Sequence, residues 1–236
     1  MQRTILMAMS SSPASSSGAR AGESGGTAAA VSAAEHAYQA TKGAIIRGDL
    51  APGTMTSELL VCQQLGLSRT PVHEAFLRLA AEGLLSLESR KGAVVRPMSP
   101  SEARDVLEMR EAIEAMAAAR VIADGTPAGL STTLDGLLAV QERAAASRDV
   151  EAFVEADDAF HAAIVAASGN TVAVHFTRFL RDRQQRLRHQ LLRVRPEQLT
   201  AVLEQHRRLA AALADGDADR YRGLLAGHVA SHGVTS

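Results

Sequence analysis

Two short helical segments separated by a glycine, within residues 64–85, are the feature that most constrains the fold of this chain. The first segment ends at Gly66 and the second at Gly83. Ser68 can cap the second helix, and Pro71 lies in its first turn, where a missing N–H is tolerated. The second segment carries apolar residues at helical spacing, namely Val72, Ala75, Phe76, Leu79 and Ala80. Two helices joined by so tight a turn predict a helix-turn-helix, whose second helix enters the DNA major groove.

The composition favours helices over sheet, and the cysteine content is typical of a protein in a reducing compartment. Only 3% of the 236 residues are aromatic, and the single cysteine, Cys62, cannot form an internal disulfide. The formal net charge is −1, so any DNA-binding surface must be local. No apolar run reaches the roughly 18 residues that a membrane span needs, and the short apolar run at residues 5–9 lacks the basic cluster of a signal peptide. We therefore expect a cytoplasmic protein with no membrane partner.

Proline, glycine and serine divide the chain into three parts. Residues 1–32 are rich in Ser, Ala and Gly, and because they cannot bury enough apolar surface we expect a disordered tail. Residues 33–98 hold the helix-turn-helix and two strand-like runs, at 84–87 and 93–95, that predict a wing. Residues 99–236 carry only helical patterns. These lie at 99–123, 131–147, 150–167, 171–193, 196–215 and 218–232. The sequence thus predicts a mainly α protein: an N-terminal winged helix-turn-helix followed by a C-terminal, all-helical antiparallel bundle for effector binding and dimerisation.

Basic and small polar residues around the second helix are candidate DNA contacts. Arg69 and Thr70 lie at its N-terminus, where backbone N–H groups and the helix dipole favour phosphate. Arginine is also the commonest bidentate partner of guanine. Arg78 lies further along and can reach a phosphate or stay solvated, and any one of these residues alone can be a plain surface cation. The predicted DNA-binding residues are Ser68, Arg69, Thr70, His73, Arg78, Arg90, Lys91 and Gly92.

Three histidines and an aspartate of the helical part form a second candidate site. Asp157 and His161 are four residues apart and share one helical face. His206 and His228 lie on later helices, and the helices of a bundle can bring such side chains to one interior point. Three imidazoles and a carboxylate suit a borderline divalent ion such as Zn²⁺ or Ni²⁺. The spacing alone leaves open a surface Asp–His pair, or a pairing of His228 with His232.

Both parts of the chain resemble domains of one family of regulators. The segments 46–53 (IRGDLAPG), 65–79 (LGLSRTPVHEAFLRL) and 82–84 (EGL) resemble the winged helix-turn-helix of GntR-family repressors. The helical part resembles the FCD ligand-binding domain of the FadR-type branch, in the segments 109–114 (MREAIE), 157–161 (DDAFH), 168–170 (SGN), 205–206 (QH) and 216–217 (GD) and in His228. The resemblance covers about residues 35–232, and its motifs are ordered and spaced as a set.

This resemblance implies a homodimeric transcription factor. Such a protein binds a pseudo-palindromic operator in double-stranded DNA and changes its grip when a small metabolite fills the helical domain. The resemblance also implies a set of metal ligands, all at matching family positions: Asp157, His161, His206 and His228. A metal held by four protein ligands can keep open positions, and a carboxylate-bearing effector could complete them.

The resemblance further implies an effector site beside the metal. Arg110 matches a position that often grips an acid, and a bidentate Arg–carboxylate contact gives a physical reason, although an ion pair with Glu114 is the alternative. Asn170, in the matching SGN segment, is assigned to the effector site as well. Six arginines lie at 178–193, and because they spread around the helix most are expected in solvent, while one or two could line the cavity.

One position departs from the family pattern. His73 stands where GntR-type proteins usually carry an arginine after Pro-Val. A neutral imidazole cannot replace a bidentate guanidinium. Either the operator sequence differs, or the affinity is lower, or DNA binding strengthens as the pH falls; alternatively, His73 is a plain surface residue.

Two other classes of function are weighed against a ligand-responsive regulator. A metalloenzyme could activate water at the metal, but no further acid is placed as a general base, and the winged domain would be unexplained. A ligand-blind DNA-binding or architectural protein would leave the Asp/His set unexplained. We therefore expect a regulator that is not an enzyme, with repression as the commoner behaviour of the family.

Overall fold

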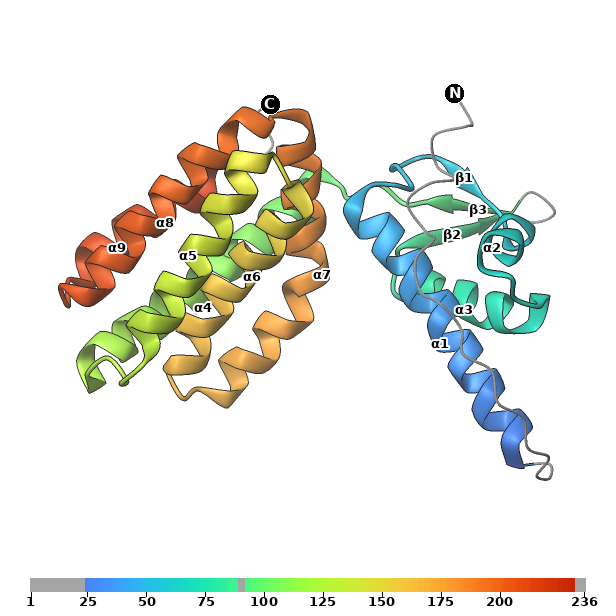
Figure 1. Ribbon diagram of the computed structural model, residues 1–236, viewed down its shortest axis with the longest axis horizontal. Helices are drawn as coiled ribbons and strands as arrows, with labels where there is room; N and C mark the ends of the chain where they lie inside the picture. Colours follow the sequence, from blue (N-terminus) through green and yellow to red (C-terminus); the bar gives the residue numbers. More distant parts are fainter. Residues whose placement is uncertain (1–23, 89–91, 232–236) are drawn as a thin grey trace. The chain divides into compact units, whose positions relative to one another are not determined.

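The computed structural model describes residues 24–88 and 92–231, and the chain forms two compact units, Met1–Pro97 and Met98–Ser236 (Figure 1). The division falls one residue before the boundary expected from the sequence. Each unit has an apolar core of its own. No helix in the described part of the chain is long and apolar enough to cross a membrane.

The first unit packs helices against a small antiparallel sheet. Its described elements are α1 (Ser24–Arg47), β1 (Met55–Thr56), α2 (Glu58–Leu65), α3 (Arg69–Ala81), β2 (Leu85–Glu88) and β3 (Gly92–Val95). The strand order is β1-β3-β2, with Met55 opposite Val94 and Leu85 opposite Val95. The sequence does not predict β1. Helix α1 begins at Ser24, so it includes residues 24–32, which are assigned to the tail from the sequence and whose alanines favour a helix.

The helix-turn-helix is confirmed in α2 and α3. Ser57 caps α2, since its Oγ accepts a hydrogen bond from the backbone N–H of Leu60. Gly66 ends α2 with a φ of 67°, a left-handed conformation that suits glycine. Ser68 occupies the N-cap position of α3, but its side chain makes no capping hydrogen bond. The apolar face of α3 is buried as predicted, through Pro71, Val72, Ala75, Phe76 and Leu79.

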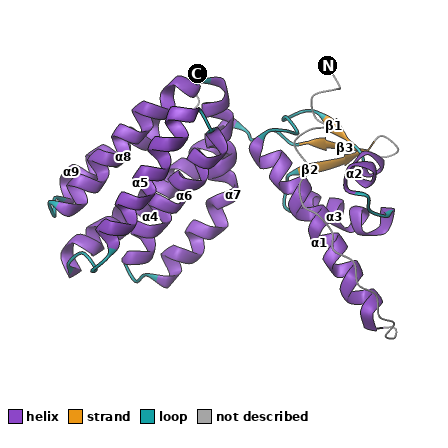
Figure 2. Cartoon of the chain, viewed as in Figure 1, coloured by secondary structure: helices purple, strands orange, loops and turns teal. Residues whose placement is uncertain are grey.

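The second unit is a bundle of helices that are connected by short loops (Figure 2). Its described elements are α4 (Pro100–Asp124), α5 (Leu130–Ser147), α6 (Val150–Ala167), α7 (Thr171–Val194), the 3₁₀ turn η2 (Pro196–Gln198), α8 (Leu199–Ala214) and α9 (Ala218–Ser231). Phe160, Ile164 and Leu209 are fully buried members of its largest apolar cluster. Ser99 and Asp149 cap α4 and α6 through their side chains, which explains where these two helices begin.

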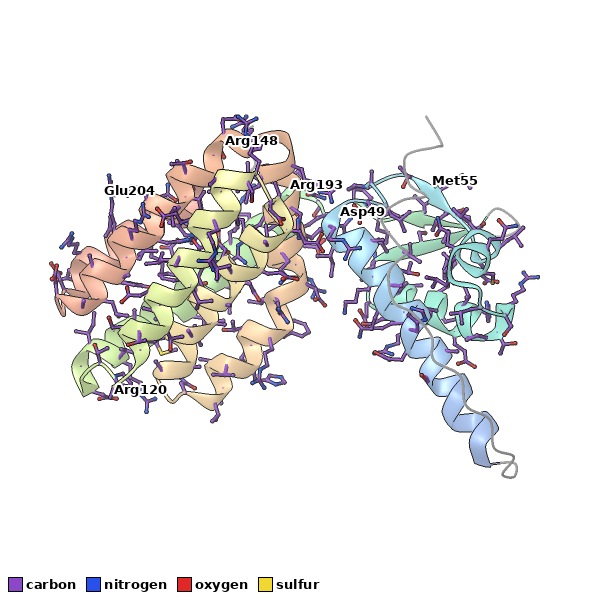
Figure 3. All side chains as sticks on the ribbon, in the orientation of Figure 1. Asp49, Met55, Arg120, Arg148, Arg193 and Glu204 are labelled. Carbon is purple, nitrogen blue, oxygen red and sulfur yellow. The ribbon has the colours of Figure 1, made fainter. Side chains whose placement is uncertain are left out.

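The interior of this bundle also holds polar and charged side chains. The charged and imidazole side chains that are at most 2% exposed there are Arg110, Glu114, Asp157, His161, Arg188, His206 and His228. By contrast, Arg120, Arg148 and Glu204 lie at the periphery of the unit (Figure 3). Charged residues are almost never fully buried unless they are paired or bind a ligand. The buried polar cluster is therefore the place to look for a site.

Candidate metal centre and DNA-binding surface

Three helices bring Asp157, His161, His206 and His228 together inside the bundle. The first two lie one turn apart on α6, while His206 comes from α8 and His228 from α9. Each residue offers one ligand atom, and these atoms all lie within 4.8 Å of one another. The four residues predicted from the sequence thus share one interior point, where His228 is 1% exposed.

The outer nitrogen of each imidazole faces an acceptor, which sets its tautomer. His206 Nδ1 donates to Gln141 Oε1 at 2.6 Å, and His228 Nδ1 donates to Gln205 Oε1 at 2.8 Å. His161 Nδ1 lies 2.7 Å from Glu114 Oε2. For His206 and His228 the amide oxygen accepts the Nδ1 proton, so Nε2 presents a lone pair. Outer acceptors of this kind orient the histidine ligands of metal sites.

The inner atoms of the cluster fit a cation. His161 Nε2 and His206 Nε2 lie 3.2 Å apart, and His206 Nε2 lies 3.2 Å from Asp157 Oδ1. Unless one of them carries a proton, the two imidazole nitrogens repel at this distance. Neither buried oxygen of Asp157 accepts a hydrogen bond from a described residue, although Oδ2 lies 2.6 Å from Arg188 Nε. A divalent ion among these atoms would remove both problems. Three nitrogens and one carboxylate oxygen are a donor set that Zn²⁺ and Ni²⁺ accept.

Buried charges around the cluster shift its titration. Burial alone would raise the pKa of Glu114, but the charges of Arg110 and His161 outweigh burial and lower it to about 2. Burial would also raise the pKa of Asp157, yet Arg188 and His206 hold it well below its usual range. Burial lowers the pKa of His161 to about 4, although Glu114 opposes this shift. Both carboxylates are therefore ionised near neutral pH, and His161 is neutral, as a metal ligand must be.

Metal-free protein should become less stable as the pH falls from about 6.5 toward 4. The pKa of His161 is about 4 in the folded protein and about 6.5 in the unfolded chain, so the unfolded chain binds more protons in this window. We expect chelator-treated protein to lose about 2 kcal/mol of its free energy of unfolding between about pH 7 and pH 5, measured by urea denaturation. His161→Gln should flatten this pH dependence, and an unchanged slope in that variant would contradict the assignment.

The two residues predicted to bind an effector have defined structural contacts. Arg110 is buried on α4; its Nε donates to Glu114 Oε1 at 2.8 Å, and its Nη2 lies 3.1 Å from His228 Nε2. The ion pair with Glu114 therefore forms, at the edge of the metal cluster. Asn170 caps α7 through its Oδ1, and its Nδ2 faces Met116 Sδ at 3.8 Å. A role for Asn170 in effector binding stays a prediction.

The start of α3 presents the predicted DNA-contacting residues to solvent. The side chain of Arg69 is 86% exposed and that of His73 is 54% exposed, and Ser68 and Thr70 are exposed as well. Glu58 of α2 contacts both basic residues, with Oε2 at 3.0 Å from Arg69 Nε and Oε1 at 2.6 Å from His73 Nδ1. The hydrogen bond with His73, and to a smaller extent that with Arg69, lowers the pKa of Glu58.

The other predicted DNA contacts behave differently. Arg78 lies over the ring of Tyr38, 3.6 Å from its centroid, and its Nη1 donates to Glu35 Oε2 at 2.6 Å. This arginine therefore ties α3 to α1. Gly92 has a φ of 104°, and a Cβ at this position would collide with the backbone oxygen of Thr56. The close approach of β1 to β3 therefore accounts for a glycine here without any contact to DNA. Arg90 and Lys91 lie outside the described residues.

Several residues of the metal centre are not predicted from the sequence. Gln141 and Gln205 are common helix residues, and only the fold places their oxygens on imidazole nitrogens. Arg188 is one of six arginines on α7, and its burial cannot be inferred from a helix whose arginines spread around the axis. Glu58 could be noticed in the sequence, because it is the first residue of α2 and acidic residues are favoured at the N-terminus of a helix.

Known proteins match both units. Residues 33–95 match the family model of bacterial regulatory proteins, gntR family, and residues 105–231 match the FCD domain model. The HTH-type transcriptional repressor GlaR of Escherichia coli is 30% identical over 198 residues, which cover 81% of this chain and 90% of that protein. An uncharacterized HTH-type transcriptional regulator of Agrobacterium vitis is 34% identical over 154 residues, covering 63% of this chain and 86% of that protein.

Solved structures agree. E. coli McbR/YncC is similar with a TM-score of 0.69 and 26% identity over 84% of this chain and 94% of that chain. A putative GntR regulator from Rhodococcus sp. RHA1 shares the fold, with a TM-score of 0.68 and 22% identity over 85% of this chain and 95% of that chain. The resemblance found in the sequence is thereby confirmed. The chain belongs to the GntR family of bacterial regulatory proteins, in the branch with an FCD domain, and is a DNA-binding transcriptional regulator rather than an enzyme.

Proposed function

We propose that this protein is a cytoplasmic, homodimeric repressor whose grip on a pseudo-palindromic operator is released by a small carboxylate. The carboxylate binds beside a divalent ion held by Asp157, His161, His206 and His228. The observation that carries this proposal is the buried convergence of these four residues within 4.8 Å. A ligand-blind DNA-binding protein has no need for such a cluster, which is costly to bury without a ligand.

Each residue of the centre has a definite task in this proposal. The four ligands hold Zn²⁺ or Ni²⁺, Gln141 and Gln205 fix the tautomers of His206 and His228, and Glu114 faces Nδ1 of His161. When bound, the ion supplies a positive charge to which an oxygen of the effector can coordinate. Arg110 keeps a guanidinium next to His228 and can form a charge-assisted contact with the effector carboxylate.

Repression is supported by the names of relatives. GlaR and RspR of E. coli are named HTH-type transcriptional repressors, and RspR is 29% identical over 193 residues. A dimer with two recognition helices suits a DNA site made of two half-sites. In each half-site, Arg69 and Thr70 at the start of α3 can reach base edges and phosphates.

An apolar face on α4 and α7 supports the dimer. Among the described residues of the helical unit, all large hydrophobic side chains that are exposed lie on these two helices: Met109, Met116, Val172, Phe176 and Phe179. The two helices pack together and are joined by an ion pair between Arg183 and Glu102. A cluster of exposed apolar side chains marks an interaction surface, and a two-fold interface needs one self-complementary patch.

The variant Phe179→Glu should weaken the dimer. The side chain of Phe179 is 61% exposed, so its replacement should leave the fold of the unit intact while placing a charge in the proposed interface, where it opposes its symmetry mate. Sedimentation equilibrium should then detect monomers at concentrations where the unaltered protein is dimeric. Ser131→Glu, which adds the same charge on the exposed surface of α5, is the control. A Phe179→Glu variant that stays fully dimeric would contradict this interface.

The proposed function is tested on full-length protein purified without chelator. An operator is first selected from a pool of random DNA duplexes, and the divalent ion is quantified by mass spectrometry. We expect a stoichiometric ion per chain, operator binding that weakens steeply with salt, and release by a panel of small carboxylates that chelator-treated protein does not show. Absence of a bound ion, or release that is indifferent to chelation, would refute the proposed mechanism.

A further inference from the structure

Arg188 of α7 is a buried cation with unused hydrogen-bond donors beside the metal centre. Its side chain is 1% exposed, and its Nε lies 2.6 Å from Asp157 Oδ2. Its Nη1 lies 3.6 Å from Asp158 Oδ1. None of its three nitrogens makes a hydrogen bond among the described residues. Buried guanidinium groups normally have their donors satisfied, so this one is poised for a further anionic partner.

The other charged groups near Arg188 already have closer partners. Arg110 uses Nε on Glu114 and turns Nη2 to His228. Asp158 accepts a hydrogen bond from Arg181 Nε at 2.6 Å, which is shorter than its contact with Arg188. Of the two fully buried arginines at the centre, Arg188 is thus the one with all of its donors unsatisfied.

Charge balance indicates how much negative charge is missing. The buried cations Arg110 and Arg188 are offset by the buried carboxylates Glu114 and Asp157, each at an ion-pair distance. The remaining buried carboxylate, Asp158, is offset by Arg181, whose Nε lies 2.6 Å from its Oδ2. The three imidazoles add no charge in their neutral form. A divalent ion at the four ligands therefore brings two positive charges that no buried side chain of the cluster offsets. Uncompensated charge is strongly disfavoured in a protein interior, so the loaded centre favours anionic groups that together carry up to two negative charges.

We propose that the effector is a dicarboxylate and that Arg188 binds its second carboxylate. This inference rests on the proposed function, because it takes the metal centre and the first carboxylate from it. The two oxygens of Asp157 point to different charges: Oδ1 faces His206 Nε2 at 3.2 Å, and Oδ2 faces Arg188 Nε at 2.6 Å. The proposed metal position and Arg188 therefore face different oxygens of the Asp157 carboxylate. Two separate anionic groups match this arrangement better than a single compact dianion does.

The test compares acids of equal carbon number on metal-loaded, full-length protein. Malonate, succinate, glutarate and adipate are titrated against propionate, butyrate, valerate and hexanoate, with sulfate as a compact dianion, and binding is followed by calorimetry. We expect at least one dicarboxylate to bind about tenfold or more tightly than its monocarboxylate partner. Equal binding of each pair, no binding by any dicarboxylate, or sulfate that binds as tightly as the best dicarboxylate would overturn the proposal.

Two variants locate the second carboxylate. Arg188→Gln should reduce the preference for the dicarboxylate to about threefold or less, whereas Arg178→Gln, on the same helix but exposed, should keep it. A preference that survives in Arg188→Gln would overturn the role of Arg188. Should that variant not fold, Arg188→Lys serves instead, because it keeps the charge but loses the planar donor pair and should bind the dicarboxylate more weakly.

Metal content and operator binding are measured on the same samples. If the ion is absent, the proposed function fails. If the ion and operator binding are present but the dicarboxylate preference is not, the inference about Arg188 fails alone.

Discussion

His206→Ala is expected to abolish metal binding and the effector response while DNA binding persists. His206 is fully buried, and its Nε2 lies 3.2 Å from both His161 Nε2 and Asp157 Oδ1. Removing one of four ligands also leaves Gln141 Oε1 without its donor. Because loss of an outer partner alone costs 10- to 100-fold in metal affinity, we expect loss of the ligand itself to cost more than about 100-fold. Mass spectrometry of the purified variant measures the effect.

The fold of the DNA-binding unit should survive this change. That unit has its own core, which includes Val72, Phe76 and Leu79 of α3. The variant should therefore bind the operator and fail to release it when effector is added. His175→Ala, which removes an exposed histidine from α7, is the matched control and should retain the ion. Normal metal content in His206→Ala would rule out the four-residue site.

Local signals in the sequence explain the elements that it predicts well. The bounds of α2 and α6 follow from caps and glycines, since Ser57 and Asp149 begin these helices through side-chain hydrogen bonds. The strand β1 has only two residues, and its pairing with β3 joins segments about 40 residues apart. No local pattern contains that pairing.

The residues of the metal centre likewise fall into those that the sequence predicts and those that it does not. The four ligand residues are reactive types at family positions, so they could be predicted as a set. The residues around them are not recognisable by type: Gln141 and Gln205 lie on α5 and α8 and matter only because the fold turns their oxygens toward Nδ1 of His206 and His228. Whether an arginine of α7 is buried depends on which helices pack around it, and a sequence pattern shared by six arginines does not contain this information.

Arg69→Ala is expected to weaken operator binding by about 1–3 kcal/mol, or roughly 5- to 150-fold, and to relax base preference at one position of each half-site. Arg69 is the first residue of α3 and its side chain is 86% exposed, so it is free to reach a base edge. In the absence of DNA its Nε contacts Glu58, which also contacts His73. This exposed contact is worth little, so DNA can replace it at small cost.

A second variant and a second DNA duplex serve as controls for this prediction. Arg78→Ala should affect DNA affinity less, because Arg78 is held over Tyr38 and paired with Glu35, and it should instead reduce the stability of the packing between α1 and α3. Affinity for unrelated duplexes separates the two kinds of DNA contact, since a phosphate contact weakens binding to all sequences alike, whereas a base contact weakens the operator most. Fluorescence anisotropy on operator and scrambled duplexes measures both. If Arg69→Ala binds both duplexes as the unaltered protein does, then α3 does not read DNA through its N-terminus, and the expectation that His73 contacts the operator would fail with it.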